Sequence, residues 1–148
     1  MKIAIGSDHG GYGLKQNIIK YLEDSGYEYN DFGTYSEDSV DYPDFGKKVS
    51  ESVAKGEYDK GIVICGTGIG ISIACNKVRG IRCALCSDIY SAKKAAEHNN
   101  ANIIALGGRV LGQDLAQAIV EAFLSSEFES GRHERRVNKI MDIEENML

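Results

Sequence analysis

The chain has 148 residues, of which 43% are hydrophobic and 26% charged, and its formal net charge is −5. This apolar fraction excludes a disordered chain, and a single proline beside 17 glycines excludes collagen-like and proline-rich linker sequences. The acidic balance, with no long basic run, argues against a partner made of duplex nucleic acid. The length suits one domain that buries about 70% of its unfolded surface. We therefore expect a single domain over residues 1–148.

The targeting and cysteine patterns predict a soluble, cytoplasmic protein with no membrane partner. Asp8 and His9 come too early to leave room for the apolar core of a signal peptide. The most apolar stretch, residues 61–75, contains glycines and is shorter than the roughly 20 residues of a membrane helix. All cysteines lie in apolar segments, where reduced thiols are expected. Cys83 and Cys86 match a C-x-x-C spacing, but on a strand they point to opposite faces, so we expect no metal site.

Short apolar segments alternate with glycine-bearing turns and helically spaced segments. The strands are predicted at residues 2–6, 27–32, 61–65, 81–86 and 103–106. The apolar helix faces are predicted at residues 14–22, 45–53, 73–78, 88–96, 115–123 and 137–143, the last being a C-terminal amphipathic helix. Five β-then-α units predict an α/β fold, a Rossmann-like three-layer sandwich around a five-stranded parallel sheet. Ligands bind beyond the carboxyl ends of strands in such folds, so the turns after strands one, three and five are candidate sites.

The turn after the third predicted strand reads Cys-Gly-Thr-Gly-Ile-Gly at residues 65–70. Its alternating glycines let backbone N–H groups converge on an anion or a developing oxyanion. A dinucleotide-binding loop with Asp88 on the ribose is an alternative, although its third glycine would come one residue later, and a purely structural tight turn is another. Cys65 lies beside this loop, where a thiolate is favoured, and is therefore a candidate base or nucleophile.

Two other turns carry polar side chains among glycines. After the first strand, Asp8 suits a hydroxyl group and His9 suits an anion or a proton shuttle, although Asp8 or Ser7 would equally cap the next helix. Arg109 follows the fifth strand, a place that favours contact with a ligand.

Four further candidate residues lie on predicted helices in the C-terminal half of the chain. His98 and Asn99 come at the end of the fourth helix, where a purely structural role in ending that helix is the main alternative. Arg132 and Arg136 are four residues apart and share one helical face, which suits a phosphate but is also typical of a solvated surface.

Taken together, these motifs resemble the type B ribose-5-phosphate isomerases, a family that includes isomerases of allose 6-phosphate and galactose 6-phosphate. The resemblance covers nearly the whole chain and is carried, in the family's order, by residues 6–11, 41–43, 65–72, 76–77, 80–82, 98–99 and 131–133. It implies a homodimer, or dimers paired into a tetramer, that interconverts ribose 5-phosphate and ribulose 5-phosphate with no metal or other cofactor. One branch of the family uses a Glu base at the position of Ile71, so this apolar residue leaves Cys65 as the base.

The resemblance also implies a role for each candidate residue. Cys65 would move a proton between C2 and C1 through a cis-enediolate, Thr67 would relay a hydroxyl proton, and His98 would aid opening of the sugar ring. The residues implied to bind the substrate are Asp8, His9, Tyr42, Gly66, Thr67, Gly68, Ile69, Gly70 and Asn99. The residues implied to bind its phosphate are His9, Arg109, Arg132 and Arg136.

The order of the elements separates two of these residues within one chain. His98 precedes the fifth strand whereas Cys65 ends the third, and a five-residue strand spans about 17 Å. If both act in one reaction, His98 and Asn99 reach Cys65 of a neighbouring subunit, which predicts a composite active site in a homodimer. The alternatives are an isomerase of a six-carbon sugar phosphate, a non-catalytic module that binds a sugar phosphate or nucleotide, and an NAD-dependent dehydrogenase.

Overall fold

The computed structural model describes residues 1–146, so the last two residues of the predicted 1–148 domain lie outside the described part. A five-stranded, all-parallel sheet with strand order β2-β1-β3-β5-β4 forms the middle layer. The strands are β1 (Lys2–Ser7), β2 (Glu28–Asp31), β3 (Lys60–Cys65), β4 (Cys83–Leu85) and β5 (Ile103–Gly107). The predicted α/β fold with five parallel strands is confirmed.

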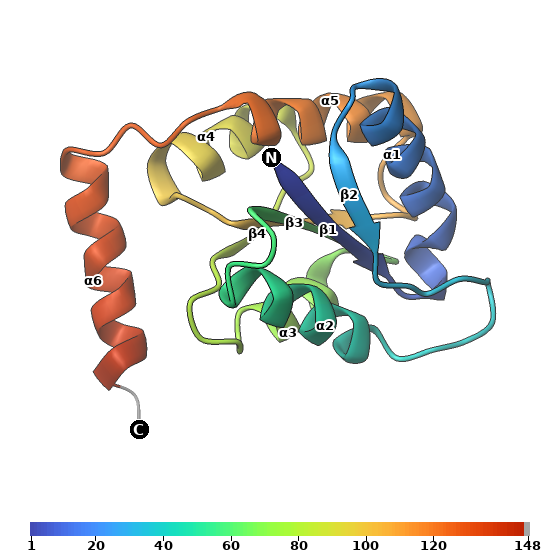
Figure 1. The fold of residues 1–148 in the computed structure, drawn as a ribbon, viewed down its shortest axis with the longest axis horizontal. Coiled ribbons are helices and arrows are strands. Elements are labelled where there is room, and N and C mark those ends of the chain that lie inside the picture. The colour runs from blue at the N-terminus through green and yellow to red at the C-terminus, as the bar shows by residue number, and fades with distance from the viewer. Residues whose placement is uncertain (147–148) are drawn as a thin grey trace.

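Helices cover both faces of the sheet (Figure 1). One face carries α1 (Tyr12–Asp24), α4 (Ile89–Asn99) and α5 (Gln113–Ser125), and the other carries α2 (Tyr42–Ala54) and α3 (Ile69–Cys75). Successive strand residues point to opposite faces, so each central strand contributes to two cores. In β3, Ile62 and Ile64 join the core under α1, α4 and α5, whereas Val63 and Cys65 join the core under α2 and α3. The side chain of Cys65 thus lies on the face covered by α2 and α3.

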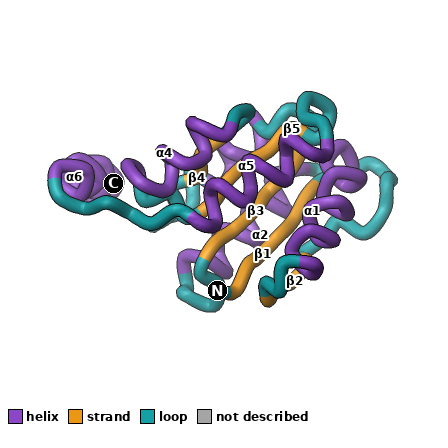
Figure 2. Tube along the Cα trace, turned by 90° about the horizontal axis from the view of Figure 1, so that it is seen from above, coloured by secondary structure: helices purple, strands orange, loops and turns teal. Residues whose placement is uncertain are grey.

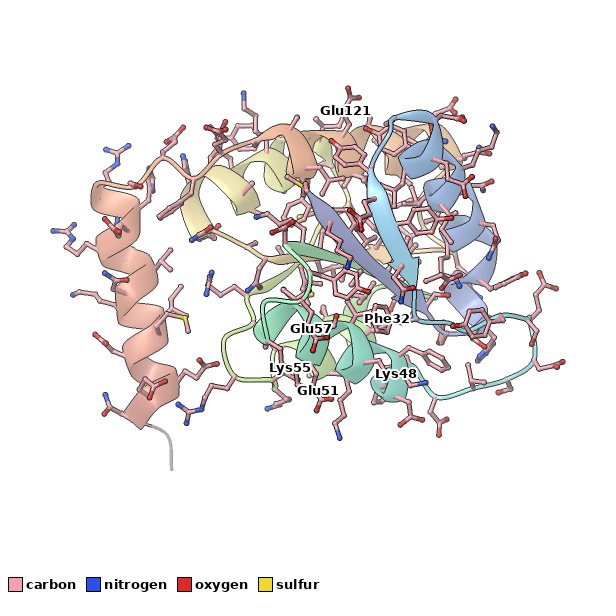
Figure 3. All side chains as sticks on the ribbon, in the orientation of Figure 1. Phe32, Lys48, Glu51, Lys55, Glu57 and Glu121 are labelled. Carbon is pink, nitrogen blue, oxygen red and sulfur yellow. The ribbon has the colours of Figure 1, made fainter. Side chains whose placement is uncertain are left out.

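Most elements begin or end within a few residues of their predicted positions, and α3 ends at Cys75, before the predicted Val78. Two further differences have a clear physical reason. Strand β4 is shorter than expected because the backbone N–H of Arg82 donates to Oδ1 of Asn102 at 2.8 Å, instead of extending the strand. Helix α2 begins at Tyr42, earlier than predicted, because Pro43 fits the first turn of a helix, where no N–H is needed. Lys48 on this helix and Lys55, just after its end, are both exposed (Figure 3). The early start places Tyr42 at the end of α2 that faces the predicted site.

Helix α6 (Arg132–Asn146) stands apart from the layers, beside α4 (Figures 1 and 2). Its far end is tied to the body by Arg79, which pairs with Glu145 at 2.6 Å, and by Glu144, which accepts from the backbone N–H of Gly80 at 3.0 Å. Of its predicted apolar residues, Val137 is buried but Ile140 and Ile143 are exposed, so part of its apolar face is uncovered within this chain. Among residues 1–146, no helix is both long enough and apolar enough to cross a membrane.

Candidate active site

The turns after β1, β3 and β5 meet at the carboxyl edge of the sheet, as the strand order requires. The backbone N–H of Gly108 donates to the carbonyl of Cys65 at 2.8 Å, and that of Arg109 donates to the carbonyl of Gly66 at 2.9 Å. A Cβ on Gly108 would lie 2.7 Å from the carbonyl oxygen of Gly10, so a larger residue would force the first and third of these turns apart. The three predicted turns therefore form one continuous backbone surface.

Cys65 lies within the glycine loop and its sulfur faces the loop's own amides. The thiol is 4% exposed, and the N–H of Gly68 donates to its Sγ at 3.2 Å. Gly68 has φ of +78°, and a Cβ there would lie 2.8 Å from the carbonyl carbon of Leu106, so only glycine suits this position. Beside it, Thr67 accepts from the N–H of Ile69 through Oγ1 at 3.2 Å. A base and several hydrogen-bond donors thus share one turn, as enolisation of a carbonyl compound requires.

The first turn supplies an acid and an imidazole whose orientations are fixed by the backbone. Asp8 is buried, and its Oδ1 accepts from the N–H of Gly11 at 3.1 Å, so its carboxylate also caps a short 3₁₀ turn, η1 (His9–Gly11). His9 accepts from the N–H of Val40 through Nδ1 at 3.1 Å. An imidazole that accepts at Nδ1 carries its proton on Nε2 when neutral, so this nitrogen of His9 can donate to an anion.

A buried lysine holds the segment that orients His9. Lys15 is fully buried on α1, and its Nζ donates to both carboxylate oxygens of Asp31, at 2.6 and 2.7 Å, and to the carbonyl of Thr34 at 2.6 Å. These bonds fix the chain that runs from β2 towards Val40. The sequence analysis did not predict a role for Lys15. Its helical spacing from the buried residues Ile18 and Leu22 places it on the same face of α1, and this spacing could have identified it as a buried lysine.

Arg109 and Tyr42 flank the glycine loop. A Cβ on Gly66 would lie 3.3 Å from Nη1 of Arg109, and one on Gly70 would lie 2.6 Å from the ring of Tyr42. The guanidinium of Arg109 therefore lies against the start of the loop, and the ring of Tyr42 lies against its end. Within one chain, Asp8, His9, Tyr42, the loop with Cys65, and Arg109 form a first residue group.

The remaining predicted residues form a second residue group elsewhere in the chain. Cys65 is level with Gly107 in the sheet, whereas His98 precedes the beginning of β5 by five residues. His98 and Asn99 end α4, where Arg82 donates to the carbonyl of Asn99 at 3.2 Å and to that of Asn100 at 2.8 Å. Arg132 and Arg136 begin the adjoining α6 and are exposed. The structure does not bring this second group to the first group of the same chain.

His98 stacks on the imidazole of His133, with ring centroids 3.9 Å apart and planes 9° apart. With Glu129 they form the one group of three possible metal-ligating side chains among residues 1–146, their ligand atoms lying within 4.8 Å of one another. Nitrogen lone pairs lie in the plane of an imidazole, so in a nearly parallel stack they run side by side instead of converging on one ion. The arrangement is therefore that of two stacked imidazoles beside one carboxylate, at 3.4 and 3.5 Å from its Oε2.

Two other cysteines, Cys83 and Cys86, lie in surroundings that disfavour a thiolate. A hydrogen bond with Cys75, together with burial, raises the pKa of Cys83, and burial raises the pKa of Cys86 to about 11. Cys83 and Cys86 pack on opposite faces of the sheet, as predicted for a strand. These environments favour the protonated thiol of Cys83 and Cys86 at neutral pH.

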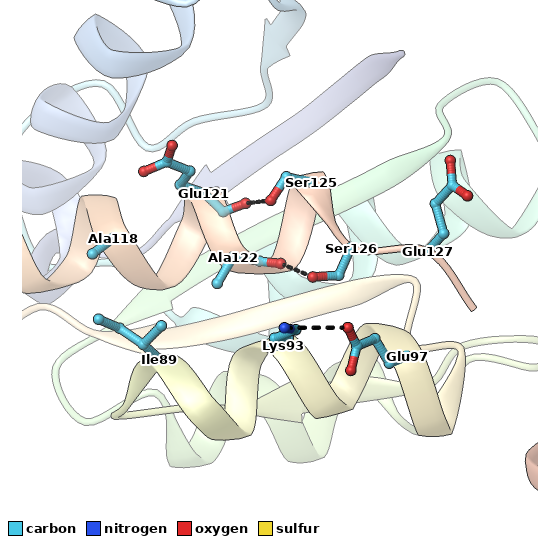
Figure 4. A pocket seen from close by; sticks show the side chains of 9 residues that line it. All are labelled: Ile89, Lys93, Glu97, Ala118, Glu121, Ala122, Ser125, Ser126 and Glu127. Atoms are coloured by element: carbon cyan, nitrogen blue, oxygen red, sulfur yellow. Dashed lines mark hydrogen bonds and ion pairs between the residues drawn. The ribbon is translucent and has the colours of Figure 1, made fainter. Parts of the chain in front are cut away.

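A groove of about 680 Å³ lies between α4 and α5, away from the glycine turns (Figure 4). Its walls carry Glu97, Glu121 and Glu127, and Lys93 pairs with Glu97 at 3.7 Å. Three carboxylates with one paired cation disfavour a phosphate by like-charge repulsion. The chemistry of a phosphorylated ligand is thus matched by the glycine turns and not by this groove.

The chain matches the ribose/galactose isomerase family over residues 3–140. Ribose-5-phosphate isomerase B of Escherichia coli (strain K12) is 49% identical to it over 144 residues, 97% of either chain. Ribose-5-phosphate isomerase B of Clostridium thermocellum has a solved structure similar to this one, with a TM-score of 0.98 and 60% identity over 100% of both chains. Ribose-5-phosphate isomerase B of Mycoplasma genitalium, solved with bound ribulose-5-phosphate, gives a TM-score of 0.94 at 40% identity, covering 99% of this chain and 97% of that one. The chain therefore belongs to the ribose/galactose isomerase family and is an isomerase.

Proposed function

We propose that the chain interconverts D-ribose 5-phosphate and D-ribulose 5-phosphate by proton transfer through a cis-enediolate, with Cys65 as the base. The observation that carries this proposal is the position of the Cys65 sulfur, which accepts from the N–H of Gly68 at 3.2 Å inside the loop of amides. A thiolate there takes a proton from a carbon beside a carbonyl while the adjacent N–H groups stabilise the negative charge that forms on oxygen.

The proposed steps conserve every atom and need no external oxidant. The Cys65 thiolate removes the proton from C2 of the open-chain aldose, and the electron pair moves to form the enediolate. Amides of Gly66–Gly70 stabilise its oxygens, and the exposed Thr67 hydroxyl moves the proton between O1 and O2. Cys65 then returns its proton to C1, which yields the ketose. Asp8 and Asn99 hold substrate hydroxyls, and His98 donates the proton that opens the ring.

The phosphate is proposed to lie near His9 and Arg109 of one chain and Arg132 and Arg136 of another. The bond from the N–H of Val40 leaves Nε2 of His9 free to donate, and Arg109 lies against the glycine loop. Guanidinium groups match phosphate oxygens in pairs, which explains why several arginines suit this end of the substrate.

We propose a composite active site in a homodimer, with dimers paired into a tetramer as the alternative assembly. The first and second residue groups lie too far apart in one chain, because β5 alone spans about 17 Å. Exposed apolar side chains lie beside both groups. Ile69 and Leu85 lie beside the glycine loop of the first group, and Ile140 and Ile143 lie on α6, which carries part of the second group. Exposed apolar side chains gathered beside functional groups are typical of protein interfaces.

A six-carbon sugar phosphate is the second candidate substrate, because the family's description includes galactose isomerases. The ring of Tyr42 lies against Gly70, so the segment that begins α2 forms a wall beside the glycine loop. Its position sets the space for the sugar chain. A comparison of kcat/KM for ribose 5-phosphate, allose 6-phosphate and galactose 6-phosphate distinguishes the two candidates, and we expect the five-carbon substrate to be preferred.

The proposed base is tested by Cys65→Ala, with Cys86→Ala as the matched control. Cys65→Ala is expected to lower isomerisation by more than about 10³-fold, because it removes the proton-transfer group, while binding of the sugar phosphate changes little. It also abolishes incorporation of solvent deuterium at C1 of ribulose 5-phosphate, measured by NMR. Cys86→Ala retains both the isomerisation and the deuterium incorporation. Near-normal turnover in Cys65→Ala would contradict the assignment, and absence of deuterium incorporation in the unmodified protein would favour a binding module.

A further inference from the structure

His133 is a buried imidazole that the proposed reaction does not use. It lies in the first turn of α6, its side chain is 9% exposed, and its ring covers the ring of His98 at a centroid distance of 3.9 Å. An apolar side chain would fill this space without the cost of burying two ring nitrogens. A polar ring stacked on the proposed ring-opening acid therefore needs a chemical explanation.

Glu129 connects the two rings. Its Oε2 lies 3.4 Å from Nε2 of His98 and 3.5 Å from Nε2 of His133. The backbone N–H of Glu129 donates to the carbonyl of Glu97 at 3.0 Å, so the residue is anchored to the end of α4. One carboxylate, on an anchored backbone, thus faces two imidazoles.

The charges around this cluster disfavour protonation of His133. Burial lowers the pKa of His133, and the charges of His98, Arg132 and Arg136 lower it further, while Glu129 opposes them. From α4, Glu97 also faces the cluster, and Lys94 pairs with Glu97 at 2.8 Å. Two stacked imidazolium ions beside one carboxylate would repel each other. His133 is therefore the ring of the pair whose protonation is disfavoured.

We propose that His133, together with Glu129, is a positioning residue for His98. The stack fixes the plane of the His98 ring, and the carboxylate balances the charge of its protonated form. The inference rests on the proposed role of His98: as the bond between C1 and the ring oxygen breaks, its electron pair goes to the ring oxygen, which takes a proton from His98. The C1 hydroxyl loses its proton to water as the carbonyl forms, and water returns a proton to His98.

Ring opening can be measured separately from proton transfer at carbon. Ribose 5-phosphate is largely a closed furanose and must open before it can react. Ribulose 5-phosphate cannot close a five-membered ring, because its O5 carries the phosphate. Exchange of its C1 proton with solvent therefore requires Cys65 but no ring opening, so damage to the alignment of His98 slows turnover of ribose 5-phosphate and spares this exchange.

The test compares both rates in His133→Leu, His133→Phe and Glu129→Gln, with Glu134→Gln as a control at a neighbouring exposed position of α6. His133→Leu is expected to lower kcat for ribose 5-phosphate about tenfold or more while exchange into ribulose 5-phosphate stays within about twofold. His133→Phe keeps a flat ring on His98 and recovers most of the loss. Turnover of ribose 5-phosphate is expected to decrease at high pH, where the imidazole of His98 loses its proton. In Glu129→Gln this decrease moves to lower pH, because the carboxylate no longer stabilises the protonated imidazole. The control changes neither rate.

Two outcomes overturn the proposal: unchanged ribose 5-phosphate turnover in His133→Leu, or a parallel fall of both rates in His133→Leu and His133→Phe. His98→Asn, assayed in the same way, separates this result from a failure of the proposed function. If His98→Asn does not lose ribose 5-phosphate turnover selectively, the role of His98 itself is wrong. If it does and the His133 variants do not, only the positioning role is wrong.

Discussion

At Gly11, the absence of a side chain lets the first turn lie directly on β3. A Cβ there would overlap the carbonyl oxygen of Ile64, which belongs to the strand that carries Cys65. Backbone on both sides of this contact leaves nothing flexible to move aside. The residue thus couples the position of Asp8 and His9 to the position of the thiol.

Gly11→Ala is expected to lower the free energy of unfolding by about 2 kcal/mol or more, because the first turn must shift away from β3. Gly13→Ala is the matched control, since a Cβ at Gly13 meets nothing within 4 Å and the residue lies in α1. It should raise stability by about 0.5 to 1 kcal/mol. Urea denaturation measures both values. Equal stability of the two variants would show that the turn and the strand are not in close contact.

Among the elements, α1 and β2 are joined by an ion pair that holds part of the site. Lys15 and Asp31 lie 2.6 Å apart, and the lysine is fully buried while the aspartate is 22% exposed. This pair fixes the segment from Asp31 to Thr34, which leads on to the Val40 amide that orients His9. The site therefore depends on an interaction outside it.

Lys15→Met is expected to destabilise the protein by about 2–3 kcal/mol, because it leaves the Asp31 carboxylate and the Thr34 carbonyl without their donor. It should also raise the KM for the sugar phosphate several-fold, since His9 loses its fixed orientation. Lys20→Met removes an exposed pair with Asp24 in the same helix and should change stability by less than about 0.5 kcal/mol. Thermal unfolding and steady-state kinetics of both variants check these values, and similar behaviour of the two would contradict the tethering role.

The elements that carry the glycine turns were predictable, because strand patterns and turn residues are local. The β-α alternation located Cys65, Asp8 and Arg109 at strand ends, and the structure shows them there. Contacts between distant segments have no such periodic pattern in the sequence. The bond from Val40 to His9 and the stack of His98 on His133 join residues more than 30 positions apart, so neither was foreseen. The separation of His98 from Cys65 was predicted, because it follows from strand order alone.

For the molecule as a whole, the proposed composite site would make activity a property of two chains. If each site takes Cys65 from one chain and His98 from its partner, a mixed dimer of Cys65→Ala and His98→Ala chains has one intact site and one doubly defective site. Random reassortment of equal amounts then restores about a quarter of all sites. We expect about a quarter of the unmodified activity after subunit exchange, from two variants that are each inactive alone.

Cys65→Ala mixed with Arg109→Ala is the control that makes this result specific. Arg109 and Cys65 belong to the same residue group of one chain, so every site in their mixed dimer lacks one of the two. That mixture should stay at the level of its parents while the mixture with His98→Ala recovers. Exchange is verified by native mass spectrometry of differently sized chains. Recovery in both mixtures would contradict the placement of Arg109 and Cys65 in the same residue group of one chain. Recovery in neither mixture after confirmed exchange would show that each site is built within a single chain, and His98 would then have to reach Cys65 by a large movement of α4 and α6.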